Sequence, residues 1–334
     1  KEFFFVPKFS TAASVFSAMT GLPDMATINK TSTNDPFAFK QHLLINDLKN
    51  YKKHFFIGGS ANWADIGGFF RRNIDGISIH EEGSYSANSV NAWGISDYDL
   101  MMEAHEIFKE EKEPFISILL TAGNHSPHTI PKINKFKREK FTEDYKKGGF
   151  ANENELNAFR FMDFALGEFI SYAKKETYYN NTIFVIMGDH GIGHETQQNN
   201  YGALSLHNYH VPLAIFSPGL NINHQKINLV ASSIDLMPTI MGLLSIPYTN
   251  TTLGIDLLNN YKEKRYSFIF TATNSTYGLI SNDYFVMTNV DGKHVVYDIN
   301  NSDLITNYHS DIDNMIVLNE GYYHISRYLR YHNE

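Results

Sequence analysis

The sequence predicts an α/β fold: an α/β/α sandwich around a mostly parallel sheet, with a small C-terminal α+β subdomain. Up to about residue 250, short apolar runs typical of buried strands alternate with amphipathic segments typical of helices. After that point, short strands with alternating polarity follow one another and a single helix closes the chain. We therefore expect a catalytic α/β domain over residues 1–250 and a subdomain over residues 251–334.

The composition is that of a folded globular protein. Of 334 residues, 43% are hydrophobic and 14% aromatic, which is ample for a sizeable core. The net charge is −8, from 28 basic and 36 acidic residues without a long run of one sign, so no nucleic-acid partner is expected. There is no cysteine, which excludes disulfides, thiolate metal sites and a cysteine nucleophile. No apolar run approaches the roughly 20 residues of a membrane span.

The first predicted helix begins at Ser10 or Thr11 and ends at Gly21, just before Pro23. Its apolar positions recur at helical spacing: Ala12, Val15, Phe16 and Met19. A hydroxyl at the start of a helix is usually an N-cap, worth about 1 kcal/mol. It can instead point into the positive end of the helix, where a phosphoryl group would also be held. The residues alone favour the cap.

The next predicted strand covers residues 54–59 and ends in two glycines. The loop after it carries Asn62 and Trp63, and a helix follows through Phe69 to Arg72. Trp63, one of two tryptophans, would therefore lie at the carboxyl edge of a strand. There it either lines a pocket or caps the core, and the sequence leaves both interpretations open.

The middle of the chain predicts a helix over residues 97–111 and a buried strand over residues 114–123. The tract Asn124-His125-Ser-Pro-His128 comes directly after that strand. Residues 131–152 are polar and Lys-rich and predict a surface excursion, and a helix with a wide apolar face covers residues 154–175.

The stretch Phe184-Val-Ile-Met-Gly-Asp-His-Gly191 predicts a buried strand, a turn at Gly188, and Asp189 beside His190 at the carboxyl edge. Ligands bind at this edge in open α/β sheets. An Asp oxygen next to a His nitrogen suits a divalent cation such as Zn or Mn. The alternative is a strand-to-loop turn with a solvated Asp. The polar loop that follows, residues 191–205, has the length and composition of a functional loop.

The remaining elements follow from simple local signals. Residues 211–216 predict a strand, and Ser232–Asp235 forms a capping box that opens a helix through Leu244. Asp291-Gly292 predicts a hairpin turn. The other expected elements are short strands at 266–271, 277–280, 284–289 and 294–299 and a helix at 311–331.

Together these motifs resemble the alkaline phosphatase/sulfatase superfamily, and within it the lipoteichoic acid synthase and phosphoglycerol transferase branch, over nearly the whole chain. The tract from Thr11 to Pro23 resembles the nucleophile helix of that family, in which a Thr stands ten residues before Gly-x-Pro. Asp189-His190-Gly191 resembles its metal motif, and Asn124-His125-Ser-Pro its substrate-binding motif. Residues 211–219 resemble the strand after the metal loop. Their order and spacing are more specific than any single motif.

The resemblance implies a metal-dependent phosphotransferase that moves a phosphoglycerol-type group through a phosphothreonine on Thr11. It implies one divalent cation, Mn or Zn with Mg as a further candidate, held by Thr11, Asp189 and His190. A threonine hydroxyl is a weak nucleophile, and a bound cation favours its alkoxide. His125 would donate to phosphoryl oxygens or protonate the leaving group.

The substrate side of the site would comprise Asn62, Trp63, His125 and His207. The resemblance further implies a phospholipid-derived head-group donor and a glycan or lipid acceptor. It places the domain outside the cytoplasm, in the bacterial periplasm or at the cell surface, with membrane association through a region upstream of Lys1. The alternatives are a phosphodiesterase, phosphatase or sulfatase-like hydrolase, and a non-catalytic pseudoenzyme that binds ligand. We expect His128, His194 and His210 to be structural.

Two departures from the family pattern matter. Sulfatases make formylglycine in a Cys/Ser-x-Pro-x-Arg tract, whereas residues 11–15 are Thr-Ala-Ala-Ser-Val, so sulfate-ester hydrolysis by that route is not expected. The strand of the family that ends in a metal-binding Glu or Asp should lie well upstream of Thr11, where this chain has ten residues. We therefore expect one acidic ligand upstream of Lys1. Residues 316–320 superficially resemble that strand, but Glu320 is set aside because its setting is a helix.

Overall fold

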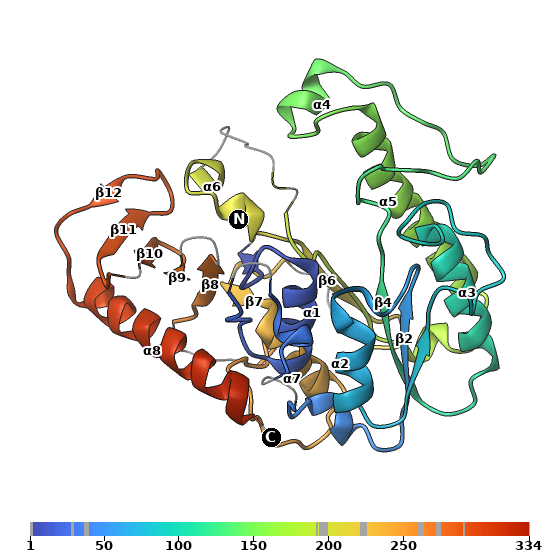
Figure 1. The fold of residues 1–334 in the computed structure, drawn as a ribbon, viewed down its shortest axis with the longest axis horizontal. Coiled ribbons are helices and arrows are strands. Elements are labelled where there is room, and N and C mark those ends of the chain that lie inside the picture. The colour runs from blue at the N-terminus through green and yellow to red at the C-terminus, as the bar shows by residue number, and fades with distance from the viewer. Residues whose placement is uncertain are drawn as a thin grey trace.

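The computed structural model describes residues 3–27, 30–36, 40–191, 193, 200–220, 226–259, 264–271, 275–289 and 291–333. Figure 1 shows helices on both sides of the central strands, with α1, α2 and α7 on one side and α3 and α5 on the other. A separate group of antiparallel strands lies toward the C-terminal helix α8. The fold is therefore the α/β arrangement with a parallel sheet at its core that the sequence predicts.

The elements have these bounds. The helices are α1 (Thr11–Thr20), α2 (Ile66–Asn73), α3 (Asp97–Glu110), α4 (Glu143–Lys147), α5 (Glu153–Ala173), α6 (Asn200–Ala203), α7 (Leu236–Leu243) and α8 (Ser310–His332). The strands are β1 (Phe4–Phe5), β2 (Lys52–Ile57), β3 (Ile77–His80), β4 (Phe115–Leu120), β5 (Phe184–Met187), β6 (Leu213–Phe216), β7 (Ala231–Ser232), β8 (Ser267–Thr271), β9 (Thr276–Ile280), β10 (Tyr284–Thr288), β11 (His294–Asp298) and β12 (Leu304–Ile305).

The parallel part of the sheet has the order β3-β2-β4. Side chains of β2 alternate between its two faces. Phe55 and Ile57 pack with α1, α2 and α7, whereas Phe56 packs with α3 and α5. A strand covered by helices on both faces must be apolar throughout, which explains the continuous apolar run in the sequence.

The strand that carries the Asp-His pair lies in a different environment. β5 pairs with β6 in antiparallel register, so the sheet is not parallel throughout. In the part of the chain that the structure describes, β4 pairs only with β2 and β5 only with β6, which leaves one edge of each strand without a partner strand. Every residue of β4 and β5 is half-buried, whereas five of the six residues of β2 are fully buried.

The C-terminal strands form an antiparallel sheet in the order β12-β11-β10-β9-β8. α8 covers it by packing Ile312 and Met315 against Phe268 and Val286. The predicted hairpin at Asp291-Gly292 joins β10 to β11, and Gly292 has the positive φ of 72° that favours glycine.

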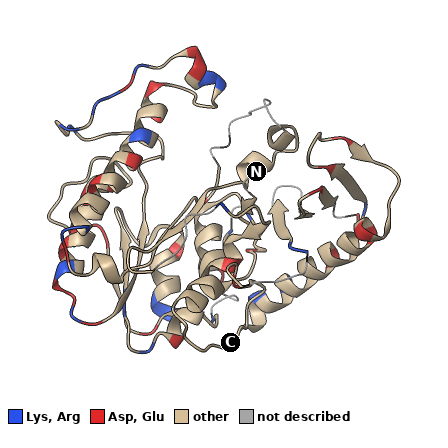
Figure 2. Cartoon of the chain, turned by 180° about the vertical axis from the view of Figure 1, so that it is seen from behind, with Lys and Arg blue, Asp and Glu red and all other residues tan. Residues whose placement is uncertain are grey.

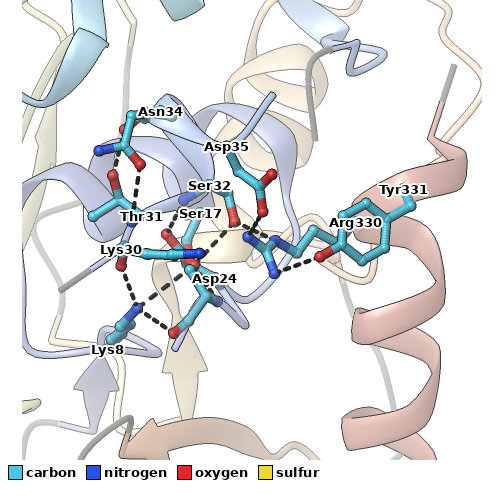
Figure 3. A network of polar contacts seen from close by, with 12 residues as sticks. Lys8, Ser17, Asp24, Lys30, Thr31, Ser32, Asn34, Asp35, Arg330 and Tyr331 are labelled. Atoms are coloured by element: carbon cyan, nitrogen blue, oxygen red, sulfur yellow. Dashed lines mark hydrogen bonds and ion pairs between the residues drawn. The ribbon is translucent and has the colours of Figure 1, made fainter. Parts of the chain in front are cut away.

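A buried polar network ties α8 back to the loop after α1 (Figure 3). Arg330 donates from Nε to Ser32 Oγ at 2.9 Å and forms an ion pair with Asp35. Asp24, fully buried, accepts from Ser32 and lies 3.6 Å from the ammonium of Lys8. Burial lowers the pKa of Lys8, and Asp24 partly offsets this. The two ends of the chain are therefore joined by charge pairs shielded from water.

Figure 2 shows acidic and basic residues intermingled along the outer helices and loops. None of the helices that the structure describes combines the length and the apolar composition needed to cross a membrane.

Candidate active site

The proposed nucleophile Thr11 lies where the N-terminus of α1 meets the carboxyl end of β5. Thr11 is the first residue of α1, and the N-cap, Ser10, makes no side-chain cap bond. The Thr11 hydroxyl donates instead to Asp189 Oδ2 at 2.6 Å, and His190 Nε2 lies 3.3 Å from the same oxygen. The N-cap interpretation, which the residues alone favour, is therefore wrong for both hydroxyls.

The turn after β5 fixes the Asp-His pair. The amide of Gly188 donates to Pro212 O at 3.1 Å, and a Cβ at Gly188 would come within 2.9 Å of the Val211 side chain, so a glycine fits best there. The His190 amide donates to Asp189 Oδ1 at 2.9 Å. His190 Nδ1 lies 2.7 Å from Gly191 O and donates its hydrogen to it, which leaves Nε2 with a lone pair directed at Thr11.

Two further residues contact the pair and were not singled out from the sequence. The Ser14 hydroxyl donates to the backbone oxygen of Asp189. Phe9 places its ring edge-on to His190, at 4.7 Å between centroids. Ser14 lies one turn after Thr11, so helical spacing alone could have placed it on the same face. The contact of Phe9 has no comparable signal in the sequence.

An aromatic wall, defined here as Trp63, Trp93 and His125, stands beside these residues. The rings of Trp93 and His125 lie 3.8 Å apart, and Trp63 packs edge-on to Trp93 at 6.0 Å. Trp63 is 39% exposed, so it does not cap the core. Asn62, next to it, is also exposed. The sequence analysis missed Trp93, although it is the other tryptophan of the chain.

His125 lies within electrostatic range of the Asp-His pair. Partial desolvation is the main cause that lowers the pKa of His125, and the nearby His190 lowers it further, whereas Asp189 raises it. His125 thus lies near Asp189 and His190, and together with Thr11 these residues form the candidate site.

The remaining sequence-predicted histidines have varied positions. The segment of His207 packs on the Asp-His-Gly tract, because a Cβ on Gly191 would lie 2.1 Å from His207 O. His207 Nδ1 is buried and finds no hydrogen bond among the described residues. His210 packs its ring against Phe5 and Tyr201, which is a structural role as expected.

Other residues weighed from the sequence lie outside this group. His128 follows the His125 turn with a φ of 58°. His194 lies outside the described residues. Glu320 lies on α8, 3.6 Å from His294, consistent with setting it aside as a ligand.

The donor set at the end of β5 fits one divalent cation. A carboxylate, an imidazole and a hydroxyl face one another at 2.6, 3.3 and 3.4 Å. Ligands about 2.0–2.3 Å from one cation lie at similar separations. The bond from His190 Nδ1 to a backbone carbonyl is the usual support for a metal-binding imidazole. Over the described ranges no cluster of three or more His, Asp or Glu side chains could hold a metal. Among the three donors named above, only Asp189 is a carboxylate.

Comparison with known proteins shows which sequences the chain is similar to. The Sulfatase family model matches residues 2–246. The lipoteichoic acid synthase of Staphylococcus aureus is 28% identical over 240 residues, covering 68% of this chain and 34% of the relative. That of Staphylococcus saprophyticus is 27% identical over 187 residues, covering 52% and 27%. The chain thus spans about a third or less of these curated relatives.

Solved structures show the same fold. An alkaline phosphatase superfamily protein from Vibrio parahaemolyticus superposes with a TM-score of 0.80 at 23% identity, covering 98% of this chain and 78% of the other. The lipoteichoic acid synthase LtaP of Listeria monocytogenes superposes with a TM-score of 0.79 at 20% identity, covering 98% and 82%.

Proposed function

This chain belongs to the Sulfatase family, and from that premise we propose that it is a metal-dependent phosphotransferase that moves a phosphoglycerol-type group through a phosphothreonine on Thr11. The observation that carries the proposal is the position of the Thr11 hydroxyl, 2.6 Å from Asp189 and 3.3 Å from His190 at a helix N-terminus. A capping hydroxyl accepts from an amide in the first turn of its helix, whereas the Thr11 hydroxyl donates to Asp189.

The reaction would proceed in two displacements. Thr11 Oγ1 attacks the phosphorus of a phosphodiester in line, while its proton, directed at Asp189 Oδ2, leaves toward that carboxylate. The bond from phosphorus to the leaving alcohol breaks, and that alcohol takes a proton from His125. In the second displacement an acceptor hydroxyl gives its proton to His125 and attacks the phosphorus of the phosphothreonine. The bond from phosphorus to Thr11 Oγ1 breaks, and Thr11 takes its proton back from Asp189.

A divalent cation, Mn or Zn with Mg as a further candidate, would be held by Thr11, Asp189 and His190. When bound, it would lower the pKa of the attacking hydroxyl and neutralise phosphoryl charge. The positive end of α1 points at the same position and adds to this stabilisation. Asn62, Trp63 and His207 are proposed to contact the head group.

A fourth ligand, a Glu or Asp, is proposed to come from a segment upstream of Lys1. Among the described residues, β4 and β5 each have one edge without a partner strand, which leaves room for an additional strand. The curated relatives are about three times the length of the matched part, which allows for such a segment.

The similarity to lipoteichoic acid synthases supports a phospholipid-derived donor, a glycan or lipid acceptor, and a position outside the cytoplasm with membrane association through another part of the protein. A hydrolase that uses water as acceptor is the alternative within the same site. A pseudoenzyme that only binds ligand is the alternative without chemistry.

Trapping the covalent intermediate tests the proposal. The protein with Mn is mixed with vesicles containing phosphatidylglycerol, quenched in acid and digested, and we expect phosphoglycerol on Thr11 by mass spectrometry. Thr11→Ala should show no adduct and a loss of turnover of at least 100-fold, whereas Thr11→Ser should keep part of both. Free glycerol phosphate without transfer would indicate the hydrolase. The absence of adduct and product in a longer form of the protein that contains the upstream segment would indicate the pseudoenzyme.

A further inference from the structure

The segment Trp93–Asp97 contacts the backbone on both sides of His125. Directly after His125, Ser126 O accepts a hydrogen bond from Trp93 Nε1 at 2.8 Å. The Trp93 ring also covers the His125 ring at 3.8 Å, with 32° between their planes. One side chain therefore holds both the backbone and the imidazole.

Asp97 fixes the backbone before His125. Its Oδ1 accepts hydrogen bonds from the amides of Ala122 and Gly123, each at 3.0 Å. Asp97 is 2% exposed, and its Oδ2 has no hydrogen-bond partner among the described residues. The carboxyl borders a cavity of about 10 Å³, which Trp93 and Gly123 also line. A buried carboxyl is costly unless it is bonded, and the amides of Ala122 and Gly123 supply these bonds to Asp97.

Close backbone contacts fix the segment itself to the end of β2. Gly94 has a φ of 98°, and a Cβ there would lie 1.8 Å from Gly58 O. The amide of Ile95 donates to the same oxygen at 3.1 Å. A Cβ on Gly123 would lie 2.3 Å from Asp97 Oδ2, so this contact also requires glycine. The segment is therefore rigid where it meets the loop.

We propose that Trp93 and Asp97 are positioning residues that set the orientation of His125 toward the phosphoryl group, an inference that rests on the proposed function. His125 is exposed on a loop beyond the end of β4, where the backbone has no sheet partner to fix it. A misplacement of about 1 Å at a catalytic group costs about 100-fold in rate. The contacts of Trp93 with Ser126 and of Asp97 with Ala122 and Gly123 fix the backbone on both sides of His125 and prevent such a displacement.

Steady-state kinetics on phosphatidylglycerol vesicles provide the first test. Trp93→Leu and Asp97→Ala should each lower kcat by about 10- to 100-fold with KM changed less than threefold, because the loop is displaced but the head-group contacts remain. Trp93→Phe keeps a ring over His125 and Asp97→Asn keeps an acceptor for the two amides, so both should retain most of the activity.

Asp99→Ala is the matched control. Asp99 also lies in the first turn of α3, where it bonds to the N-cap Ser96, but no contact joins it to residues 122–126 in the described structure. The Asp99→Ala substitution should lower the stability of α3 without changing kcat. Equal losses of kcat in Asp99→Ala and Asp97→Ala would mean that the start of α3 is merely structural, and would overturn the proposal.

Coupling and NMR separate the failure of this inference from that of the proposed function. In a His125→Ala background, Trp93→Leu and Asp97→Ala should have no further effect on kcat beyond twofold. If His125→Ala itself retains normal kcat, the catalytic role of His125 is wrong. The positioning of His125 by Trp93 and Asp97 is then tested by NMR alone. In folded protein, the ring proton signals of His125, assigned with His125→Gln, should be shifted upfield by Trp93 and should move in Trp93→Leu and Asp97→Ala. Unchanged signals in both variants would overturn the proposal whatever the kinetics show.

Discussion

At the scale of single residues, the site depends on polar groups whose partners lie far along the sequence. Thr11 and Asp189 are 178 residues apart, and their 2.6 Å contact turns a helix-terminal hydroxyl into a candidate nucleophile. Asp97 is similar, since a residue of a helix N-terminus instead holds a loop 25 residues later. In each case the local context suggests a cap, and the long-range partner determines the role.

Asp235 is a third such residue, and its burial predicts a pH-dependent stability. Its two oxygens accept from the amides of Ser232 and Ile255 at 2.8 and 2.9 Å. Burial raises the pKa of Asp235 to about 7, against the lowering effect of those two bonds and of Arg265. In the unfolded chain the carboxyl ionises near pH 3.9.

The folded state therefore binds more protons than the unfolded state between about pH 4 and about pH 7, so the contribution of Asp235 to stability falls as the pH rises through this range. We expect the difference in unfolding free energy between the wild type and Asp235→Asn to fall by about 3 kcal/mol from pH 4.5 to pH 8 and to level off above about pH 7.5. Urea titrations across this range measure it. Parallel stability curves for the two proteins would refute a raised pKa.

At the scale of elements, α8 stabilises the region around the nucleophile helix from outside the parallel sheet. Arg330, in its last turn, forms a hydrogen bond with Ser32 and an ion pair with Asp35, both in the loop after α1 (Figure 3). That loop continues to Thr33, whose hydroxyl donates to Ala64 O at 2.8 Å beside Trp63. The C-terminal helix is thereby connected to the loop that carries Trp63.

Breaking this network should cost far more than an exposed ion pair would. Arg330 is 7% exposed and the side chain of its partner Asp35 is 11% exposed, so Arg330→Met removes a well-shielded ion pair and should lower the unfolding free energy by about 3 kcal/mol. Tyr331→Phe removes only the 2.9 Å bond from Arg330 Nη1 to the phenol oxygen and should cost about 1 kcal/mol or less. Denaturant unfolding of both variants compares them directly. Similar small losses would mean that the network adds little stability.

At the scale of the whole molecule, the site lies where the helix layer of α1, the strand β5 and the loop after β4 meet. The parallel strands supply rigid ends, and the glycines at their ends allow the backbones to approach closely. The described residues bring one carboxylate to this junction. The single negative charge and the small number of ligands therefore limit which cations this junction can bind.

Metal affinity follows from that donor set. One negative charge facing a dication binds hard cations weakly, so Mn should bind the 334-residue chain more weakly than micromolar, while Zn, which accepts nitrogen ligands, should be affected less. Isothermal titration with each chloride salt measures this, with Asp189→Asn as the control that should abolish binding. Micromolar or tighter Mn binding, without additional polypeptide by mass spectrometry, would show that the ligand set is complete as it stands.

The elements were largely predictable because they depend on local periodicity. The sequence predicts a helix over 97–111 and the structure has α3 at Asp97–Glu110; it predicts a helix over 311–331 and the structure has α8 at Ser310–His332. The short strands β1, β3, β7 and β12 were missed, since two to four residues carry too little pattern. The antiparallel direction of β6 was also not predictable, because strand direction depends on the path of the connecting chain.

The sequence by itself determined the fold class, the order of the motifs and the candidate residues Thr11, Asp189 and His190, because apolar runs, turn glycines and motif spacing are properties of the chain alone. Only the tertiary structure decided that the Thr11 hydroxyl faces Asp189 instead of capping its helix and that Trp63 is exposed. It also decided that Trp93 and Asp97 form hydrogen bonds with the loop that carries His125. Those contacts join segments brought together by packing, and no local rule specifies which distant partner a polar group will meet.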